Sequence, residues 1–142
     1  MAIRDIIQDG NPLLRKISRE VTCFDEKLCK LLDDLKQTMQ KAEGVGLAAP
    51  QVGLLRRAVV VNPKIVSEEG QQVGAEGCLS VATRKQCNVK RPFKVTVEYC
   101  DRNGKPQVLK AEGFVARACC HEIDHLNGIL FIDRKQDPAK KA

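Results

Sequence analysis

The sequence is short of aromatic side chains and of long apolar runs. It has no tryptophan, and phenylalanine and tyrosine together make up 4% of its residues. A nucleic-acid site built on aromatic stacking is therefore not expected, although a net charge of +6 would favour acidic surroundings. No apolar run is long enough to cross a bilayer, so we expect no membrane association.

Cysteine is present, but no CxxC pair occurs. The seven cysteines are an odd number, and Cys119 and Cys120 are adjacent in the chain. This usage favours a reduced compartment over a disulfide-bonded one. Asp5 and Asp9 also interrupt the apolar run that a signal peptide would need. We therefore expect a cytoplasmic protein.

No internal repeat or linker divides the chain. Its 142 residues can bury one hydrophobic core but not two. We expect a single catalytic domain over residues 1–134, followed by a basic and disordered tail over residues 135–142. We also expect the protein to be a monomer.

Helical periodicity predicts two helices. Leucines recur at helical spacing between residues 25 and 42, where Asp25 is suited to cap the start and Gly44 the end. A second helix is predicted over residues 114–126, before the pair Asn127 and Gly128. The first helix should bury its leucine stripe in the core.

Strand patterns lie between the two predicted helices. Residues 58–61 form a short β-branched run, and residues 94–99 alternate apolar and polar side chains as a half-buried strand does. Residues 101–104 supply a turn, after which residues 107–111 should return as the second strand of a hairpin. These elements predict an α+β fold, with small antiparallel or mixed sheets packed around a central helix, the second one.

The only two histidines fall in this second helix, in the motif HEIDH (121–125). Positions i and i+4 lie about 40° apart on a helix, so His121 and His125 can bind a single metal ion. Glu122 lies beside them, where its carboxylate can accept a proton from metal-bound water, as in HExxH hydrolases. The alternative is a solvated helix face that carries two histidines and no chemistry.

A hydrolytic metal site needs a third protein ligand and one open position. Cys119 and Cys120 project away from the metal-facing side of the helix and are expected in the core. No third histidine follows, which excludes the HExxHxxGxxH metalloproteases. Spacing does not choose among Cys78, Cys87, Cys100 and the acidic residues, and a lone cysteine is most often a small buried residue.

The segment GVGLAAPQVG (44–53) matches the GxGxxA pattern of dinucleotide-binding folds. That fingerprint requires a preceding strand and a following helix, whereas this segment follows a helix and is interrupted by Pro50. No GK[ST] makes it a P-loop either. One interpretation is a helix stop and turn. The other is a backbone strip that pairs with a bound peptide, with the Gln51 amide as a hydrogen-bond donor.

Three segments occur together and in this order: GVGLAAPQ (44–51), EGCLS (76–80) and HEIDH (121–125). With the flanks RPFKVTV and DRNGK, the set resembles the peptide deformylase family over almost the whole chain. The resemblance implies an α+β hydrolase that removes the formyl group from N-formylmethionine of nascent bacterial polypeptides and releases formate. Its partner would be the formylated nascent peptide, in transient proximity to the ribosome.

The resemblance also implies a metal site. By matching positions, Cys78, His121 and His125 would hold one divalent ion and leave a position open. Family resemblance favours Fe²⁺, and Zn²⁺, Ni²⁺ or Co²⁺ would suit the same ligands. An iron site of this kind should lose activity in air, because oxidation attacks both the ion and its thiolate.

A catalytic set and a substrate site follow from the same matching positions. Glu122 would be the general base and acid, and the Gln51 amide with the Leu79 backbone N–H would form the oxyanion hole. The substrate peptide and its methionine side chain would be bound by Val45, Gly46, Gly77, Phe114, Arg117 and Ala118.

The sequence departs from the family pattern between Val61 and Asn62, where relatives carry a further stretch that turns and supplies another strand. The shortened sheet must cover its apolar face differently, or the fold is weakened. In addition, residues 81–83 replace the more usual Val-Pro-Gly, and Cys120 stands where Gln often precedes the HExxH motif.

Two alternative functions stay open. In the first, the chain keeps the deformylase fold and metal but has become a binding protein, against which the intact set of Gln51, Cys78 and Glu122 argues. In the second, it is a small basic ribosome-associated protein. The support for this second alternative is a weak cluster of cations: Arg84, Lys85, Lys90, Arg91 and Lys94. Formate release from a formyl-Met peptide would separate the enzyme from both alternatives.

Overall fold

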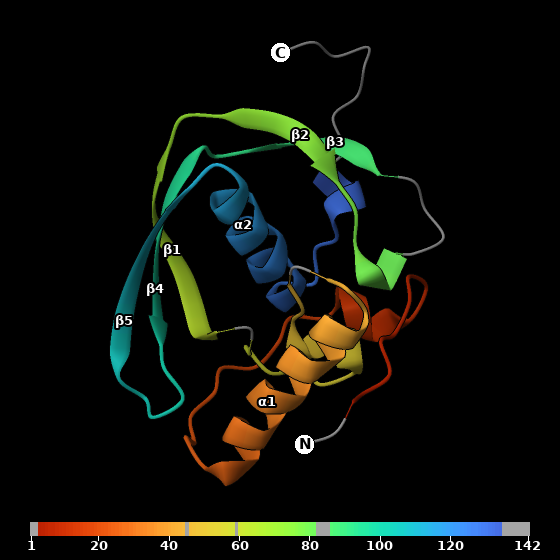
Figure 1. The fold of residues 1–142 in the computed structure, drawn as a ribbon, viewed down its shortest axis with the longest axis vertical. Helices are drawn as coiled ribbons and strands as arrows, with labels where there is room; N and C mark the ends of the chain where they lie inside the picture. Colours follow the sequence, from red (N-terminus) through yellow and green to blue (C-terminus); the bar gives the residue numbers. More distant parts are fainter. Residues whose placement is uncertain (1–2, 45, 59, 82–85, 135–142) are drawn as a thin grey trace.

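The computed structural model describes residues 3–44, 46–58, 60–81 and 86–134, so the predicted tail lies outside the described residues. Within this part of the chain, five strands form two antiparallel sheets, one ordered β1-β4-β5 and one pairing β2 with β3. Figure 1 shows α2 enclosed by the two sheets, with α1 on the other side of the molecule from β2 and β3. The α+β prediction is confirmed.

Helix α1 (Glu26–Lys41) forms where the leucine periodicity predicts it. The Asp25 side chain accepts a hydrogen bond from the Leu28 backbone N–H at 3.0 Å, which caps the first turn. Leu28, Leu31 and Leu35 are buried and pack against the loops and the start of β1. The stripe therefore anchors the N-terminal half of the chain to the core.

The end of α1 differs from the prediction. The residue in the left-handed region is Glu43, with φ of 58°, and not Gly44. Gly44 donates its backbone N–H to the Met39 carbonyl at 2.9 Å. A β-carbon at position 44 would lie 2.6 Å from the end of the Leu79 side chain, which would have to shift to make room for it. The loop after α1 therefore passes very close to the segment that carries Cys78.

Strands β4 (Lys94–Cys100) and β5 (Pro106–Glu112) form the predicted hairpin, paired antiparallel from end to end. The turn between them is held by Asp101, whose carboxylate accepts hydrogen bonds from the backbone of Asn103 and Lys105. Of the Asn-Gly pair, only Gly104 has a positive φ, of 85°. The side chain of Asp101 therefore does part of the work that we expected from the Asn-Gly backbone.

The strand predicted over residues 58–61 is wrong in its bounds. Strand β1 spans Val61–Glu69 and pairs with β4, whereas Ala58 makes only an isolated bridge with Val61. The chain turns here because the Asn62 backbone N–H donates to the Arg57 carbonyl at 3.0 Å, which leaves no room for an extended run. β1 and β5 are thus the two edges of the three-stranded sheet.

Asn62 fixes this shortened connection. Its φ of 48° places it in the left-handed region, which asparagine tolerates better than most residues. Its side chain accepts from the Val21 N–H at 2.7 Å and donates to the Val21 carbonyl at 2.8 Å. The side-chain amide therefore pairs with Val21 as the backbone of a neighbouring strand would.

The apolar face beside this connection is only partly covered. A groove of about 440 Å³ lies between α1, the start of β1 and the end of β4. Its apolar lining includes Leu32, Leu35, Met39 and Val61. Near the shortened connection, the Asn62 side chain bonds to Val21, and part of the apolar face stays open as this groove.

Strands β2 (Gln72–Glu76) and β3 (Cys87–Arg91) were not predicted. They pair antiparallel and form the second sheet, which passes over one end of α2 in Figure 1. Their sequences are polar and contain Gly74, so no hydrophobic alternation identifies them. This hairpin matters for the site because Cys78 follows directly after β2.

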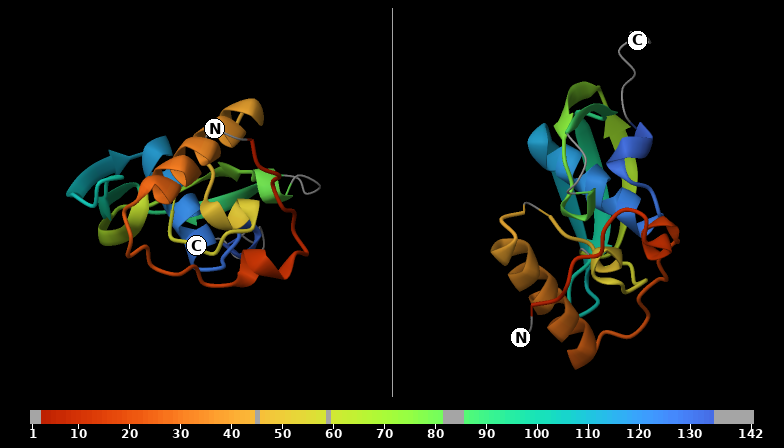
Figure 2. Two further views of the ribbon diagram at one scale, coloured as in Figure 1. Left: turned by 90° about the horizontal axis from the view of Figure 1, so that it is seen from below. Right: turned by 90° about the vertical axis from the view of Figure 1, so that its right-hand side faces the viewer.

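Helix α2 (Phe114–Leu126) has the predicted bounds. Figure 2 shows it running through the interior with β1, β4 and β5 along one side. Cys120 is buried against Val95 and Val97, as predicted for a core thiol, and Cys119 is partly buried beside this cluster. None of the helices in the described part of the chain has the length and apolarity that a membrane span requires.

The role of Asn62 gives a first prediction, on stability. Asn62→Ala should lower the free energy of unfolding by about 3 kcal/mol, since it loses two hydrogen bonds of about 1 kcal/mol each and alanine tolerates the left-handed region less well than asparagine. Asn62→Gly loses the same bonds without that strain and should cost about 1 kcal/mol less. Urea unfolding measures both, and equal losses would contradict the left-handed assignment.

Candidate active site

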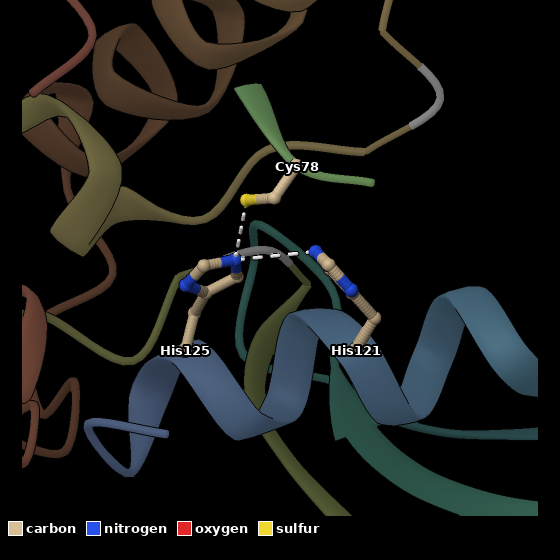
Figure 3. Close-up of side chains that lie close together, drawn as sticks. All are labelled: Cys78, His121 and His125. Atoms are coloured by element: carbon tan, nitrogen blue, oxygen red, sulfur yellow. Dashed lines mark hydrogen bonds between the residues drawn. The ribbon is translucent and has the colours of Figure 1, made fainter. Parts of the chain in front are cut away.

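Cys78, His121 and His125 converge at one point, from two elements far apart in the sequence. His121 and His125 lie one turn apart on α2, and Cys78 lies in the segment after β2. Their ligand atoms all lie within 4.8 Å of one another. Figure 3 shows the thiol and both rings pointing toward a common centre. Among the described residues, no other group of histidines, cysteines and acids meets the same distance criterion.

The spacing of these atoms fits a metal ion. The Cys78 Sγ lies 3.3 Å from the His125 Nε2, and the two Nε2 atoms are 3.3 Å apart. Ligands at metal distances of about 2.0–2.3 Å in a tetrahedral arrangement lie roughly 3.3–3.6 Å from one another. One thiolate and two imidazoles are also a donor set typical of zinc and of other divalent transition metals. The residues present therefore fit the group that the sequence predicts.

His121 is oriented by a carboxylate. Its Nδ1 lies 2.9 Å from Glu76 Oε1, so an N–H at Nδ1 donates to Glu76 and leaves the Nε2 lone pair facing His125 and Cys78. Burial disfavours a charged ring, but the hydrogen bonds with Cys78 and Glu76 raise the pKa of His121. Burial and the charges of His121 and Arg91 lower the pKa of His125, which favours its neutral form.

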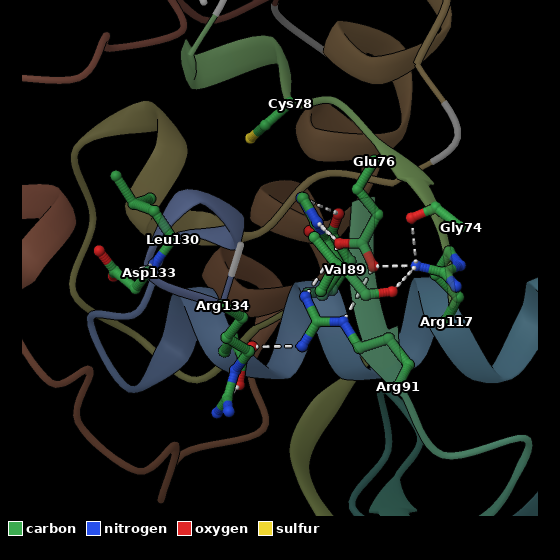
Figure 4. A network of polar contacts seen from close by, with 12 residues as sticks. Gly74, Glu76, Cys78, Val89, Arg91, Arg117, Leu130, Asp133 and Arg134 are labelled. Carbon is green, nitrogen blue, oxygen red and sulfur yellow. Dashed lines mark hydrogen bonds and ion pairs between the residues drawn. The ribbon is translucent and has the colours of Figure 1, made fainter. Parts of the chain in front are cut away.

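Glu76 is the centre of a buried ion network. Arg91 binds both of its carboxylate oxygens, each at 2.9 Å, and Arg117 donates to Oε2 at 2.7 Å. Burial alone would raise the pKa of Glu76, but the bonds from Arg91 and His121 lower it to about 2. Figure 4 shows Arg91 and Arg117 reaching this carboxylate from different elements. Glu76 is therefore ionised and held in place at neutral pH.

The network continues to the end of the described chain. Arg91 donates to Asp124 at 2.6 Å, and Asp124 also accepts two hydrogen bonds from Arg134, at 2.6 and 3.1 Å. Glu76, Arg91 and Asp124 thus join β2, β3, α2 and the C-terminal turn. Sequence reasoning missed these three roles. The one signal in the sequence was that Glu76 directly precedes the Gly-Cys pair and that Asp124 lies inside HEIDH, close to the candidate metal ligands.

Glu122 lies beside the ligand cluster and is buried. Its Oε1 is 3.8 Å from His121 Nε2, and its Oε2 has no hydrogen-bond partner among the described residues. Burial raises the pKa of Glu122 to about 7, partly offset by the charge of His121. A β-carbon at Gly46 would lie 2.7 Å from Glu122 Oε1, so the backbone of the glycine segment covers this carboxylate directly.

Gln51 is buried with its amide group aimed at the cluster. Its Oε1 accepts from the Ala48 N–H at 2.8 Å, which fixes the orientation of the amide. The Nε2 therefore faces the site, where it donates to Ser80 Oγ at 3.1 Å and approaches Cys78 Sγ at 3.5 Å. Leu79, the other predicted oxyanion residue, lines the same cavity.

One cavity of about 440 Å³ brings the predicted residues together. Gly46, Gly77, Phe114, Arg117 and Ala118 all contribute to its lining, beside Gln51, Cys78, His121 and Glu122. Val45 lies outside the described residues. The Arg117 guanidinium is also tied to Glu76 and to the carbonyls of Gly74 and Val89. Its side chain therefore forms part of the wall, while its charge serves the ion network.

Comparisons with known sequences and structures point to one protein family. The family model described as polypeptide deformylase matches residues 3–141. The peptide deformylase of Thermoanaerobacter pseudethanolicus is 51% identical over 94% of this chain and 90% of its own length. That of Caldicellulosiruptor bescii is 53% identical over 94% of this chain and 86% of its own length.

Solved structures agree with this result. The crystal structure of peptide deformylase from Thermotoga maritima superposes with a TM-score of 0.92 at 37% identity, covering 96% of this chain and 100% of that one. A peptide deformylase from Synechococcus elongatus in complex with actinonin has a TM-score of 0.91 at 39% identity, covering 96% and 80% of the two chains.

The alignments also bear on the length of the chain. They extend over 144 positions, although 94% of this 142-residue chain is only about 133 residues. About ten aligned positions therefore have no residue in this chain, which is the length of a short strand with its turn. The family model, the identities and the structural superpositions agree, and the chain belongs to the polypeptide deformylase family.

Proposed function

We propose that Cys78, His121 and His125 hold the divalent ion with which this enzyme removes the N-formyl group from formylated polypeptides. Deformylation itself follows from membership of the family, which is metal-dependent. The observation that supports the residue roles is the convergence of the three ligand atoms beside the buried carboxylate of Glu122. Formate release from a formyl-Met peptide, measured with the metal-loaded protein, tests the activity.

The cation and its ligands have distinct parts in this proposal. When bound, a divalent cation lowers the pKa of water and polarises a carbonyl oxygen. Two neutral imidazoles and one thiolate leave such an ion with a net positive charge and an open position. We propose Fe²⁺ as this ion, and Zn²⁺, Ni²⁺ or Co²⁺ would suit the same ligands.

Glu122 supplies the proton transfers. Because burial brings its pKa to about 7, its carboxylate can both take up and release a proton near neutral pH. It accepts a proton from the attacking water at a carboxylate oxygen and later delivers that proton to the leaving amine. No described residue forms a hydrogen bond with the Glu122 Oε2 atom, so this oxygen is available for the proton transfer.

Gln51 and Leu79 stabilise the negative charge that develops on the formyl oxygen. The Gln51 amide is already oriented by Ala48, so it donates without reorganisation. The backbone N–H of Leu79 would be the second donor. Removing one donor of this kind typically costs about 3 kcal/mol of barrier stabilisation.

The peptide would lie along the cavity that these residues line. Its backbone would pair with Val45 and Gly46, as in the addition of a strand, and Gly77 would allow close approach from the other side. Phe114, Arg117 and Ala118 would border the methionine side chain. A formyl hydrogen is the smallest acyl substituent, so crowding by Gly46 and Glu122 would reject larger acyl groups.

Two of the five cations behind the alternative of a basic ribosome-associated protein have acidic partners in the fold. Arg91 is buried in the ion network, and Lys94 lies 3.9 Å from Glu112 across the β4–β5 pair. Arg84 and Lys85 lie outside the described residues. The proposed enzyme is cytoplasmic and monomeric, and it acts on nascent chains close to the ribosome.

The ligand assignment predicts a change in metal content. Cys78→Ser should weaken metal binding by more than 100-fold, since loss of an outer partner alone costs about 10- to 100-fold. Cys100→Ser is the matched control, because Cys100 lies at the far end of β4 and outside the ligand group. Elemental analysis of anaerobically purified protein measures the stoichiometry, and an unchanged value for Cys78→Ser would remove it from the ligand set.

The proton-transfer role predicts a loss of turnover without a loss of metal. Glu122→Gln keeps the shape of the side chain but removes its basicity, so kcat should fall by about 100- to 10,000-fold. The metal content should stay at the level of the unmodified enzyme. Glu112→Gln, at an exposed position of β5, is the control and should retain full activity. Turnover within a few-fold of the unmodified enzyme would rule out this role for Glu122.

A further inference from the structure

A second cavity lies on the face of α2 opposite the ligand cluster. It has a volume of about 390 Å³ and is bounded by β1, the end of β3 and the α2 residues Cys120, Ile123 and Asn127. On a helix these three positions point about 120° to 180° away from the mean direction of His121 and His125. Among the described residues, the two cavities share no lining residue. A ligand here would therefore leave the substrate cavity open.

Cations dominate the lining of this second cavity. It contains five basic and two acidic residues: Arg57, Lys64, Lys90, Arg91, Arg134, Glu68 and Asp124. Arg91 and Arg134 both bind Asp124, so their charges are partly balanced. The remaining three cations face a single acid, Glu68.

These three cations have no carboxylate partner among the described residues. The Arg57 guanidinium donates only to neutral oxygens, namely the carbonyls of Ser18 and Leu126 and the Asn127 side chain at 3.0 Å. Lys64 and Lys90 are exposed, and the side chain of neither forms an ion pair or hydrogen bond with another described residue. Arg57 is held rigidly, and the two lysines are free to move onto a ligand.

We propose that this cavity binds the phosphodiester backbone of RNA. Guanidinium and ammonium groups recognise phosphate oxygens, and three cations without a carboxylate partner among the described residues line one hollow. No aromatic side chain lines the cavity, so the contact is to the backbone and is independent of sequence.

Sequence reasoning found no such site because these cations are spread along the chain. Arg57, Lys64, Lys90 and Arg134 lie in four separate segments, and only the fold gathers them. The proposal stands apart from the catalytic roles above, since it uses none of the catalytic residues. For an enzyme of nascent chains, it would hold the protein on an RNA surface with the substrate cavity accessible.

The proposal is tested by fluorescence anisotropy. A short single-stranded RNA of mixed sequence is titrated with the full metal-loaded chain at several salt concentrations. Three phosphate contacts predict a slope of log K against log salt of about −2, or roughly 20-fold weaker binding at 200 mM than at 50 mM salt. The double variant Lys64→Gln, Lys90→Gln should reduce the magnitude of this slope by about 1.4. Its turnover of a short formyl-Met peptide should be unchanged.

The matched control removes the same charge from a different surface. Lys27 and Lys30 are exposed on α1, so Lys27→Gln, Lys30→Gln should keep the slope of the unmodified protein. An equal loss in both double variants would overturn the proposal, because it would indicate a diffuse charge effect. Equal affinity for polyglutamate, or saturation by inorganic phosphate with no RNA binding, would overturn it as well.

Discussion

The Glu76 carboxylate is the group on which the rest of the site depends. It accepts hydrogen bonds from Arg91, Arg117 and His121, and these three residues come from β3 and α2. A buried carboxylate is stable only when it is paired in this way, and each buried cation needs it in return. The same bonds that join the second sheet to α2 therefore also set the tautomer of a metal ligand and the position of Cys78, two residues further along.

Asp124 extends this arrangement to the other face of α2. The helix carries His121, Glu122 and His125 toward the substrate cavity and Asp124 toward Arg91 and Arg134. The HEIDH segment thus lines the substrate cavity on one side and attaches the C-terminal turn on the other. A short helix can do both because its side chains at successive positions point in different directions.

The predictable parts of the fold are those with a local period. Helices α1 and α2 have leucines or histidines at helical spacing, and β4 alternates, so their bounds were found within a residue or two. The hairpin of β2 and β3 has no such pattern, because its strands are largely polar and two of their buried residues, Glu76 and Arg91, are charged. The left-handed Asn62 was missed as well, since its partner Val21 is 41 residues away.

The candidate site divides in the same way. The histidine pair can be recognised from the five residues of HEIDH. The candidate third ligand could not be chosen from spacing among Cys78, Cys87, Cys100 and the acidic residues until the EGCLS segment was matched to a family. The Glu76 network leaves no local trace, because it pairs residues 15 to 45 positions apart in the chain. Charges that a linear reading treats as scattered surface cations are, for Arg91 and Arg117, the partners of a buried acid.

The contact between Gly46 and Glu122 limits how this enzyme can evolve. Every amino acid other than glycine has a β-carbon, and the space that it would occupy is already filled by the Glu122 side chain. A single codon change at position 46 therefore displaces the general base that we propose, whatever residue it introduces. Variants that escape an inhibitor by altering this glycine would have to move the Glu122 carboxylate, so resistance at this position comes with a displaced acid.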